Sequence, residues 1–482
     1  MPKPSVAIIG SGISGLAAGF FLHRHFDLTL FEADDRVGGH TNTRYVDVAQ
    51  SKLVDRHEPV LAKRLADGSV LPIDTGFIVF NDRTYPNMIR LFGELGVGSQ
   101  ATEMSFSVRC DRSGIEYSGS TLNSYFAQRR NLLRPSFYQF LFDFYRFGKQ
   151  AVAYLETEDE VQTVGEFFAQ HRYGDAFYRR YFLPMGSAIW SCPQGVFESF
   201  PIRFICQFYH HHGLLTIRNR PQWRVVKGGS IQYIRPLVNG FKDRIQTRSP
   251  VVSVRRNEIA RAGDGTRWQV QVQPTEPNGS VANVTHSFDH VILACHSDQA
   301  LRILQPTSGS ALESTLKAFP YQSNMATLHT DISALPRNRR AWAAWNYHLP
   351  STGQSPGSKT DSSDHATVTY NMNLLQGYSN EQTRGKTFCV TLNGDAGIDP
   401  AHVIEKIPYA HPIFSLQRLS AQRSHDQWID ADGMSLCGAY WGNGFHEDGL
   451  NSALKVSEKL LGMDPWKAVC TADGSSTVGS NR

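Results

Sequence analysis

Three glycines close to the N-terminus have the spacing of a phosphate-binding turn. Gly10, Gly12 and Gly15 form the pattern G-x-G-x-x-G, and Glu32 follows 22 residues after Gly10. Glycines let a pyrophosphate approach backbone N–H groups where a Cβ would collide with it, and an acid at this distance accepts hydrogen bonds from ribose hydroxyls. The pattern predicts a dinucleotide site at the start of the chain.

The sequence on either side of the glycines predicts the strands and the helix that position them. Residues 6–9 predict a short buried strand, residues 16–25 a helix, and residues 28–31 a second strand that ends at Glu32. Strand, glycine turn, helix, strand and acid is the order of a nucleotide-binding unit. A glycine-rich turn without a ligand is the alternative interpretation.

The same segment also resembles a targeting signal in one respect. Residues 4–22 carry no charge and follow Lys3, as in a signal peptide or a membrane anchor. Four glycines and three serines in this stretch make a poor spanning helix. We therefore expect a strand and phosphate turn, and a cytoplasmic protein.

A second glycine pair follows the acid. Arg36, Gly38, Gly39 and His40 complete the pattern E-x-x-x-R-x-G-G-[RKH] that begins at Glu32. This pattern resembles the flavin-containing amine oxidase superfamily, whose members bind FAD. The resemblance implies that the loop passes beneath the FAD pyrophosphate and flavin, and that FAD rather than NAD is the cofactor. His40 stands where the family usually has Arg or Lys.

Further segments resemble the family in the same order. Residues 74–76 are similar to its segment under the flavin, Val251 to its backbone contact with adenine, and residues 289–295 to a strand of its nucleotide domain. Residues 435–450 resemble the strand and helix that close the FAD site. The match over residues 74–87 is similar to a mostly uncharacterised branch of predicted NAD/FAD-binding proteins, often found beside cyclopropane-fatty-acid synthases.

The resemblance implies one FAD-binding set drawn from all these motifs. Its members are Gly10, Gly12, Ile13, Ser14, Gly15, Glu32, Ala33, Arg36, Gly38, Gly39, His40, Thr41, Asp74, Thr75, Gly76, Val251, Ala294, Gly438, Phe445, His446 and Leu450. The catalytic acid or base is not identified. Candidates for positions near the flavin or in the substrate pocket are Trp190, His212, Trp223, Tyr440, Phe445 and His446.

Two departures from the family bear on the reaction. Phe445 falls near the place where amine oxidases carry one tyrosine of an aromatic cage, and Ala439 replaces an acid that binds the ribitol in many relatives. Residues 210–212 are three consecutive histidines, but consecutive side chains point in different directions and no further ligand stands at a suitable spacing. We expect no metal site.

The predicted fold class is α/β, with a discontinuous Rossmann-like FAD-binding domain interleaved with an α+β substrate domain, as in amine oxidases and glutathione-reductase-like proteins. The FAD-binding domain is predicted from residues 1–90, 228–300 and 429–465, and the substrate domain from residues 91–227 (helical part) and 301–428 (sheet part). Residues 466–482 are predicted to be a disordered tail, and residues 50–69 an irregular surface insertion.

Composition limits the partners. Lys and Arg number 48 and Asp and Glu 44, so the net charge of +4 does not favour nucleic-acid binding. Seven scattered cysteines predict no disulfide framework. Aromatic residues make up 11 % of the chain and supply an apolar pocket. Residues 122–155 are rich in aromatic and basic residues, which fits either a helical core with a solvated basic face or a tunnel or membrane-contacting patch for lipids.

These observations predict an FAD-dependent oxidoreductase that transfers a hydride from a substrate C–H to flavin N5. A desaturase, dehydrogenase or isomerase acting on a small hydrophobic, lipid-like or secondary-metabolite substrate is the first hypothesis. A flavin amine oxidase that releases hydrogen peroxide and a non-catalytic binding protein of the same fold are the alternatives. The oligomeric state is not indicated.

Overall fold

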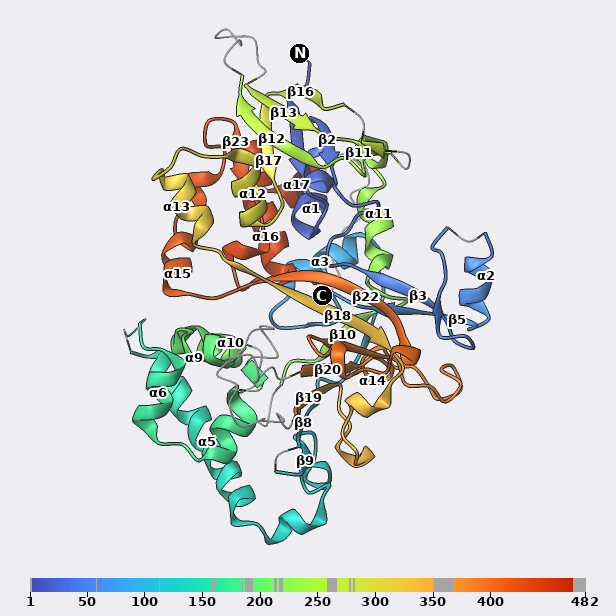
Figure 1. Cartoon of the computed structure of the whole chain (residues 1–482). Helices are drawn as coiled ribbons and strands as arrows, with labels where there is room; N and C mark the ends of the chain where they lie inside the picture. The colour runs from blue at the N-terminus through green and yellow to red at the C-terminus, as the bar shows by residue number, and fades with distance from the viewer. Residues whose placement is uncertain are drawn as a thin grey trace, which may run out of the picture.

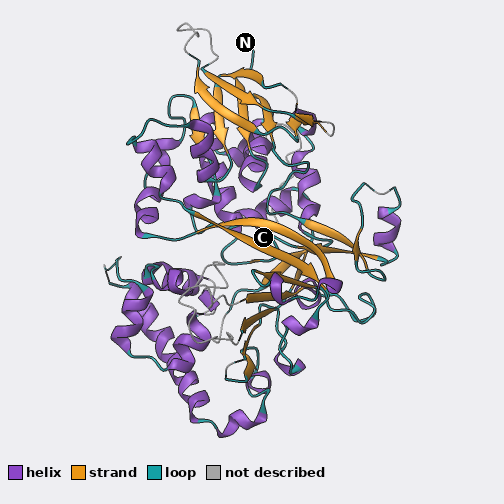
Figure 2. Ribbon diagram, in the orientation of Figure 1, coloured by secondary structure: helices purple, strands orange, loops and turns teal. Residues whose placement is uncertain are grey.

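The computed structural model describes most of the chain in two lobes (Figure 1). It describes residues 2–57, 59–111, 113–157, 159, 161–183, 185–186, 194–211, 215, 220–257, 267–276, 279–280, 282–350 and 367–470. The structure confirms the predicted α/β class, with helices and strands in both lobes (Figure 2).

The nucleotide lobe is built on a five-stranded parallel sheet with the order β11-β2-β1-β17-β23. Its strands come from three separated stretches of chain. Strand β1 lies in the centre, with β2 and β11 on one side and β17 and β23 on the other. Buried residues such as Val6 and Ile8 in β1 explain why an uncharged segment stands at the N-terminus. The strands are β1 (Ser5–Ile9), β2 (Asp27–Phe31), β11 (Ile245–Gln246), β17 (His290–Leu293) and β23 (Met434–Leu436).

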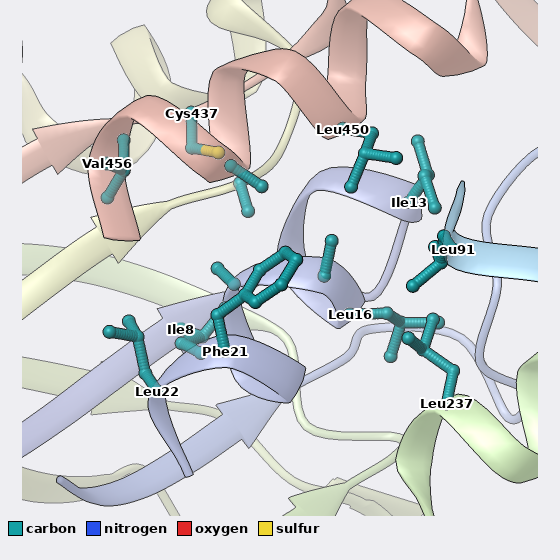
Figure 3. Close-up of a cluster of buried hydrophobic side chains, with 14 of the residues drawn as sticks. Ile8, Ile13, Leu16, Phe21, Leu22, Leu91, Leu237, Cys437, Leu450 and Val456 are labelled. Atoms are coloured by element: carbon teal, nitrogen blue, oxygen red, sulfur yellow. The ribbon is translucent and has the colours of Figure 1, made fainter. Parts of the chain in front are cut away.

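Helices α1 (Ile13–Leu22) and α16 (His446–Leu461) pack together beside this sheet. Figure 3 shows the buried side chains that join them to the strands and to neighbouring helices. Gly449 allows the close approach, since a Cβ there would come within 2.7 Å of Ile13. The helix that carries the predicted phosphate turn and the helix that follows the last glycine motif are therefore neighbours. The cluster includes Ile8, Ile13, Leu16, Phe21, Leu22, Leu91, Leu237, Cys437, Leu450 and Val456.

Other elements complete the nucleotide lobe. A three-stranded antiparallel sheet carries the predicted adenine contact at its first strand, and short helices surround both sheets. These elements are β12 (Val251–Arg256), β13 (Trp268–Val272), β16 (Val284–Phe288), α3 (Pro86–Glu94), α11 (Ile234–Val238), α12 (Ser297–Leu304) and α13 (Ala311–Lys317).

The second lobe is a seven-stranded sheet with the order β22-β18-β21-β20-β19-β8-β9. Strands β18 and β22 run antiparallel along its edge, and in Figure 1 they cross the middle of the molecule below the nucleotide lobe. The strands are β8 (Phe106–Cys110), β9 (Ile115–Ser118), β18 (Tyr321–His329), β19 (Trp345–Leu349), β20 (Thr367–Asn371), β21 (Cys389–Leu392) and β22 (Val403–Pro412).

A helical part extends this lobe at the end of the molecule opposite the N-terminus (Figure 1). The longest helix begins at Pro135, whose fixed φ suits the first helical turn. The helices are α4 (Leu122–Tyr125), α5 (Pro135–Leu155), α6 (Val164–His171), α9 (Gln194–Glu198) and α10 (Ile202–His211), with a 3-10 turn at Arg129–Leu133. Among the described residues, none of the helices is long and apolar enough to cross a membrane.

Two predictions about irregular segments are wrong. Residues 50–69 are on the surface but not irregular, because β4 (Lys52–Leu53) and the exposed α2 (Leu61–Ala66) lie there beside β3 (Thr43–Asp47) and β5 (Val70–Asp74).

Disorder from residue 466 is also wrong for residues 466–470. They belong to α17 (Pro465–Cys470), and the Trp466 ring lies buried at 4.9 Å from that of Phe21. Trp466 and Ala468 are buried and Val469 packs against the core that contains α1, so tertiary contacts order this segment.

Candidate functional site

A large cavity lies where the nucleotide lobe meets β18 and β22. It has a volume of about 1060 Å³ and is lined both by the glycine turn after β1 and by the second lobe. Of the predicted FAD-binding set, these residues line it: Gly10, Gly12, Ile13, Ser14, Glu32, Ala33, Arg36, Gly39, His40, Thr75, Gly76, Val251, Ala294, Gly438, Phe445 and His446. Four motifs far apart in the sequence thus share one cavity.

The three glycines of the first motif have different surroundings. Gly10 has φ +103°, and a Cβ there would lie 2.7 Å from the carbonyl oxygen of Ala294. A Cβ on Gly15 would collide with the carbonyl oxygen of Gly10. A Cβ on Gly12 would meet nothing within 4 Å, and its backbone (φ −64°, ψ 178°) suits any residue. Packing and conformation therefore explain Gly10 and Gly15, whereas only an open space that a ligand would fill explains Gly12.

Glu32 is held at the end of β2, on the cavity wall. Its carboxylate accepts hydrogen bonds from the backbone N–H groups of Ser11 and Asp34, both at 2.9 Å, and from the Ser11 hydroxyl. These bonds fix the carboxylate next to the glycine turn, so it would need no rearrangement to accept ribose hydroxyls. The position agrees with the role that the motif implies.

The backbone of the second glycine pair lies directly against the backbone of the first glycine turn. Gly39 has φ +55°, and a Cβ there would lie 3.2 Å from the Cα of Gly12. Arg36 supports this loop, since its guanidinium donates to the carbonyl oxygens of Gly39 (2.9 Å) and Thr41 (3.3 Å). Arg36 also lines the cavity, so it offers a positive charge beside the site for a pyrophosphate.

His40 is a neutral substitute for the basic residue of the family. Its ring stacks on Tyr409 with 4.9 Å between centroids, and its buried Nε2 has no hydrogen-bond partner in the described part of the chain. Burial, together with neighbouring histidines, holds the pKa of His40 well below the ordinary value. An imidazole with one unpaired nitrogen on the wall of this cavity fits a site for a polar cofactor. This nitrogen would form one hydrogen bond with the cofactor, as donor or as acceptor.

Five of the predicted FAD-binding residues lie behind the cavity wall instead of on it. They are Gly15, Gly38, Thr41, Asp74 and Leu450. Asp74 is buried and accepts hydrogen bonds from the Thr43 hydroxyl (2.6 Å) and the Ser230 N–H (2.9 Å), and burial raises its pKa to about 6. It joins three segments and thereby positions Gly76, which is on the wall.

His446 is the first residue of α16, and both a hydrogen bond and a ring contact hold its side chain in place. Its Nε2 lies 3.1 Å from the hydroxyl of Thr41, which also bonds the Tyr233 hydroxyl, and its ring stacks on Phe77 at 3.9 Å. Burial lowers the pKa of His446 to about 3, so the ring is neutral. The helix N-terminus at this position adds a partial positive charge that would stabilise an anion on the cofactor.

The other candidates for the pocket divide into two groups. Trp190 and His212 lie outside the described residues. Trp223, Tyr440 and Phe445 line the cavity, and the Phe445 ring stacks on Phe208 at 5.4 Å. Tyr440 is 2 % exposed, and its buried hydroxyl has no hydrogen-bond partner among the residues that the structure describes; burial raises its pKa well above the ordinary value.

A pair of further histidines on the wall was missed by the sequence analysis. His296 follows β17 and stacks on Tyr321 at 4.3 Å, and His411 lies near the end of β22 with its ring centroid 5.5 Å from that of His40. The position of His296, directly after a recognised strand, was a usable signal. His411 had none, because its environment is formed by strands distant in the sequence.

Hydrogen bonds fix the protonation of His411. The backbone N–H of Met325 donates to Asn393 Oδ1 (3.0 Å), so Asn393 Nδ2 donates to Asn324 Oδ1 (2.6 Å), and Asn324 Nδ2 donates to His411 Nδ1 (2.7 Å). His411 Nδ1 must therefore accept, and its proton is on Nε2. Burial and His296 lower the pKa of His411 to about 4, in agreement with this neutral form.

The charged residues on the wall are unevenly distributed. Among the described residues, those with carboxylate or guanidinium groups on the cavity wall are Glu32, Asp34, Arg36 and Arg302, and all four belong to the nucleotide lobe. The part formed by the second lobe carries aromatic and aliphatic side chains instead, with a few neutral polar groups. They include Met104, Phe106, Met185, Phe208, Trp223, Tyr321, Trp345, Tyr370, Leu392, Tyr409 and Phe414.

Comparison with known proteins agrees with this geometry. The family model described as flavin containing amine oxidoreductase matches residues 13–373. A protoporphyrinogen oxidase of Saccharomyces cerevisiae is 35 % identical over 80 residues, which are 15 % of this chain and 14 % of that protein. The chain thus spans only a small part of that relative's length.

Solved structures share the fold at low identity. Cyclohexylamine oxidase from Brevibacterium oxydans IH-35A has a TM-score of 0.61 at 15 % identity, with 95 % of this chain and 100 % of that chain covered. A fatty acid isomerase from P. acnes that produces CLA has a TM-score of 0.59 at 13 % identity, with 95 % and 98 % covered. Putrescine oxidase bound to putrescine has a TM-score of 0.59 at 14 % identity, with 95 % and 99 % covered.

Proposed function

The chain belongs to the flavin containing amine oxidoreductase family and is an FAD-dependent oxidoreductase, and from this premise we propose that it oxidises a C–H bond of a hydrophobic, uncharged substrate. A lipid-like or secondary-metabolite molecule is the substrate class, and the net reaction is a desaturation, a dehydrogenation or an isomerisation. The uncharged part of the cavity wall in the second lobe is the observation that supports this choice.

The residues of the nucleotide lobe fit FAD. Gly12 leaves space for its pyrophosphate, Arg36 supplies a cation, and Glu32 presents a fixed acceptor for its ribose. The N-terminus of α16 and the neutral His446 would face the cofactor from the opposite motif. When bound, FAD supplies a two-electron acceptor that takes a hydride at N5.

The second lobe would supply binding and exclusion of water. Flat aromatic rings such as Trp223, Tyr370 and Phe208 give a substrate apolar contact area, and they would keep the reacting carbon out of solvent. The neutral histidines offer hydrogen bonds without charge. His411 Nε2–H is a donor of fixed direction, since its tautomer is set by the asparagine pair.

An amine oxidase is the second candidate, and the family membership favours it. A protonated amine bound there would have no carboxylate to pair with, because the described residues of the second lobe place none on the cavity wall. The Phe445 and Phe208 rings stack on each other with 5.4 Å between their centroids, which is too close to hold an amine between them. The two candidates therefore differ in the charge of the substrate that binds.

A panel of compounds tests the proposal. The purified protein is loaded with FAD, and its flavin absorbance is followed anaerobically on addition of fatty acids, terpenoids or amines. We expect bleaching by a compound without an amino group or, for an isomerisation, conversion of that compound without net bleaching, and neither outcome with simple amines. Bleaching by amines alone, with release of hydrogen peroxide when oxygen is admitted, would reverse the ranking.

A further inference from the structure

Helix α5 has two apolar faces, and only one of them is covered. The inner face packs into the helical core. It consists of Phe137, Phe140, Phe147 and Ala151, all buried, and the partly buried Phe144, which recur every three or four residues. One apolar stripe is sufficient to hold a helix on a core, so the second needs another explanation.

The outer face repeats the same spacing toward solvent. Along α5 the exposed fractions are 51 % for Tyr138, 38 % for Leu141, 63 % for Phe142, 58 % for Tyr145 and 38 % for Val152. Large side chains with helical periodicity on the outside of a helix form a contiguous stripe, which isolated surface residues do not.

The turns before α5 extend this stripe. Leu122 at the start of α4 is 72 % exposed, and Leu132 and Leu133 in the 3-10 turn are 45 % and 88 % exposed. In Figure 1 these segments form the end of the molecule farthest from the N-terminus. Aliphatic side chains at a protruding turn are positioned to enter an apolar medium, not to line a groove.

Charge along the same segment is strongly biased. Residues 121–155 contain five basic residues and a single acid, Asp143. Asp143 is buried and pairs with Arg146 at 3.0 Å, so it contributes no negative charge to the outside. Four cations remain, namely Arg129, Arg130, Arg134 and Lys149. The excess equals the net charge of the entire chain, which is +4.

We propose that this basic apolar face, formed by the exposed residues of 121–155, docks the protein on a bilayer that contains anionic lipid. Apolar side chains would enter the acyl region while the cations pair with lipid phosphates, the arrangement of helices that lie in the plane of a membrane. Tyr138 and Tyr145 suit the interface because each has an apolar ring and a polar tip. Lys149 lies above the Tyr145 ring at 4.7 Å and brings charge to the middle of the stripe.

The position of this face connects it to the cavity. The inner side of α5 belongs to the same core cluster as Met185, Phe208 and Phe414, which line the cavity. A docked protein would therefore hold the uncharged part of the cavity above the bilayer, with α5 and α10 between them. This link rests on the proposed lipid-like substrate, whereas the docking itself does not.

Vesicle binding tests the docking without any turnover. The FAD-loaded full chain is mixed with vesicles of phosphatidylcholine, with or without phosphatidylserine, and the bound fraction is measured by flotation. We expect binding to the anionic vesicles that weakens with added salt, because paired surface charges are screened. Loss of catalysis would not affect this readout, so failure of the proposed function and failure of docking are distinguishable.

Matched variants locate the surface. Leu133→Ser with Phe142→Ser removes apolar contacts, and Arg130→Gln with Arg134→Gln removes cations; each pair should weaken vesicle binding at least roughly tenfold. Leu53→Ser with Ile332→Ser is the control, since both side chains are 43 % exposed and lie outside this face. Unchanged FAD content verifies that each variant is folded.

Three results would overturn the proposal. The wild-type protein could stay unbound to anionic vesicles at low salt, or both double variants on the face could bind as the control does. The third result is a dimer in sedimentation velocity that Leu133→Ser with Phe142→Ser dissociates, without vesicle binding, which would assign the face to a second copy of the chain.

Discussion

Replacing Gly12 by alanine separates cofactor binding from folding. The glycine has backbone angles that alanine adopts without strain, and a Cβ built on it meets no atom of the described residues within 4 Å. Gly12 also precedes the first turn of α1, where glycine is preferred over alanine by a small margin, and the entropy of the unfolded chain opposes this preference. We expect the free energy of unfolding of the apoprotein to change by about 1 kcal/mol or less.

The effect on FAD should be much larger. The new methyl group would occupy the space in front of the first N–H groups of α1, so the pyrophosphate would lose at least two charge-assisted hydrogen bonds. Each of these is worth about 1.5–3 kcal/mol, which together corresponds to about 3–6 kcal/mol. The dissociation constant of FAD should rise roughly 10²- to 10⁴-fold.

Titration of the apoprotein with FAD, followed by calorimetry, measures this constant, and thermal unfolding of the same samples measures stability. Gly93→Ala is the matched control, because its Cβ also meets nothing within 4 Å but lies on the exposed side of α3. It should keep the affinity for FAD. A Gly12→Ala protein that binds FAD as tightly as the wild type would refute the assignment of the open space to the cofactor.

Four further predictions follow from the site and its surroundings. Gly15→Ala should prevent accumulation of folded protein, since its Cβ collides with backbone, and normal expression with an unchanged thermal midpoint would contradict this. Glu32→Ala should weaken FAD binding by about 1–3 kcal/mol through unpaired ribose hydroxyls, and an unchanged dissociation constant would exclude that role. His329 is buried and its pKa is lowered to about 4; because the unfolded state binds its proton below about pH 6.5, stability should fall as pH drops from 6.5 toward 4, by on the order of 2 kcal/mol at pH 5 for this residue. Denaturant titrations at pH 7 and 5 check this, with His329→Gln reducing the difference. Asn324→Asp should place a carboxylate at His411 Nδ1 and raise the pKa of His411, and an NMR titration that still gives about 4 would contradict the fixed tautomer.

Local patterns predicted the nucleotide lobe because its chemistry is carried by neighbours in the sequence. Gly10, Gly12 and Gly15 must stand within one turn, and Glu32 one helix and one strand later, so spacing alone indicated their roles. The structure places Gly12 and Glu32 on the cavity wall as expected. Gly15 is behind it, where its lack of a side chain lets α1 approach the turn.

Contacts between elements distant in the sequence could not be predicted in this way. His411 and Asn324 are 87 residues apart and meet only because β22 and β18 pair in one register. Likewise, Trp466 is ordered by packing on Phe21 from the opposite end of the chain. The aromatic and basic residues in 122–155 fitted either a helical core or a lipid-contacting tunnel or patch, because which side of α5 faces solvent depends on tertiary packing.

A crystal structure of the FAD-loaded protein tests the central claim most directly. The account predicts that the ADP half contacts Gly12 and Glu32, that the flavin is reached by His446, and that the space beside the flavin is enclosed by the uncharged wall of the second lobe. FAD bound elsewhere, or a carboxylate or lysine side chain found facing the substrate space beside the flavin, would contradict it.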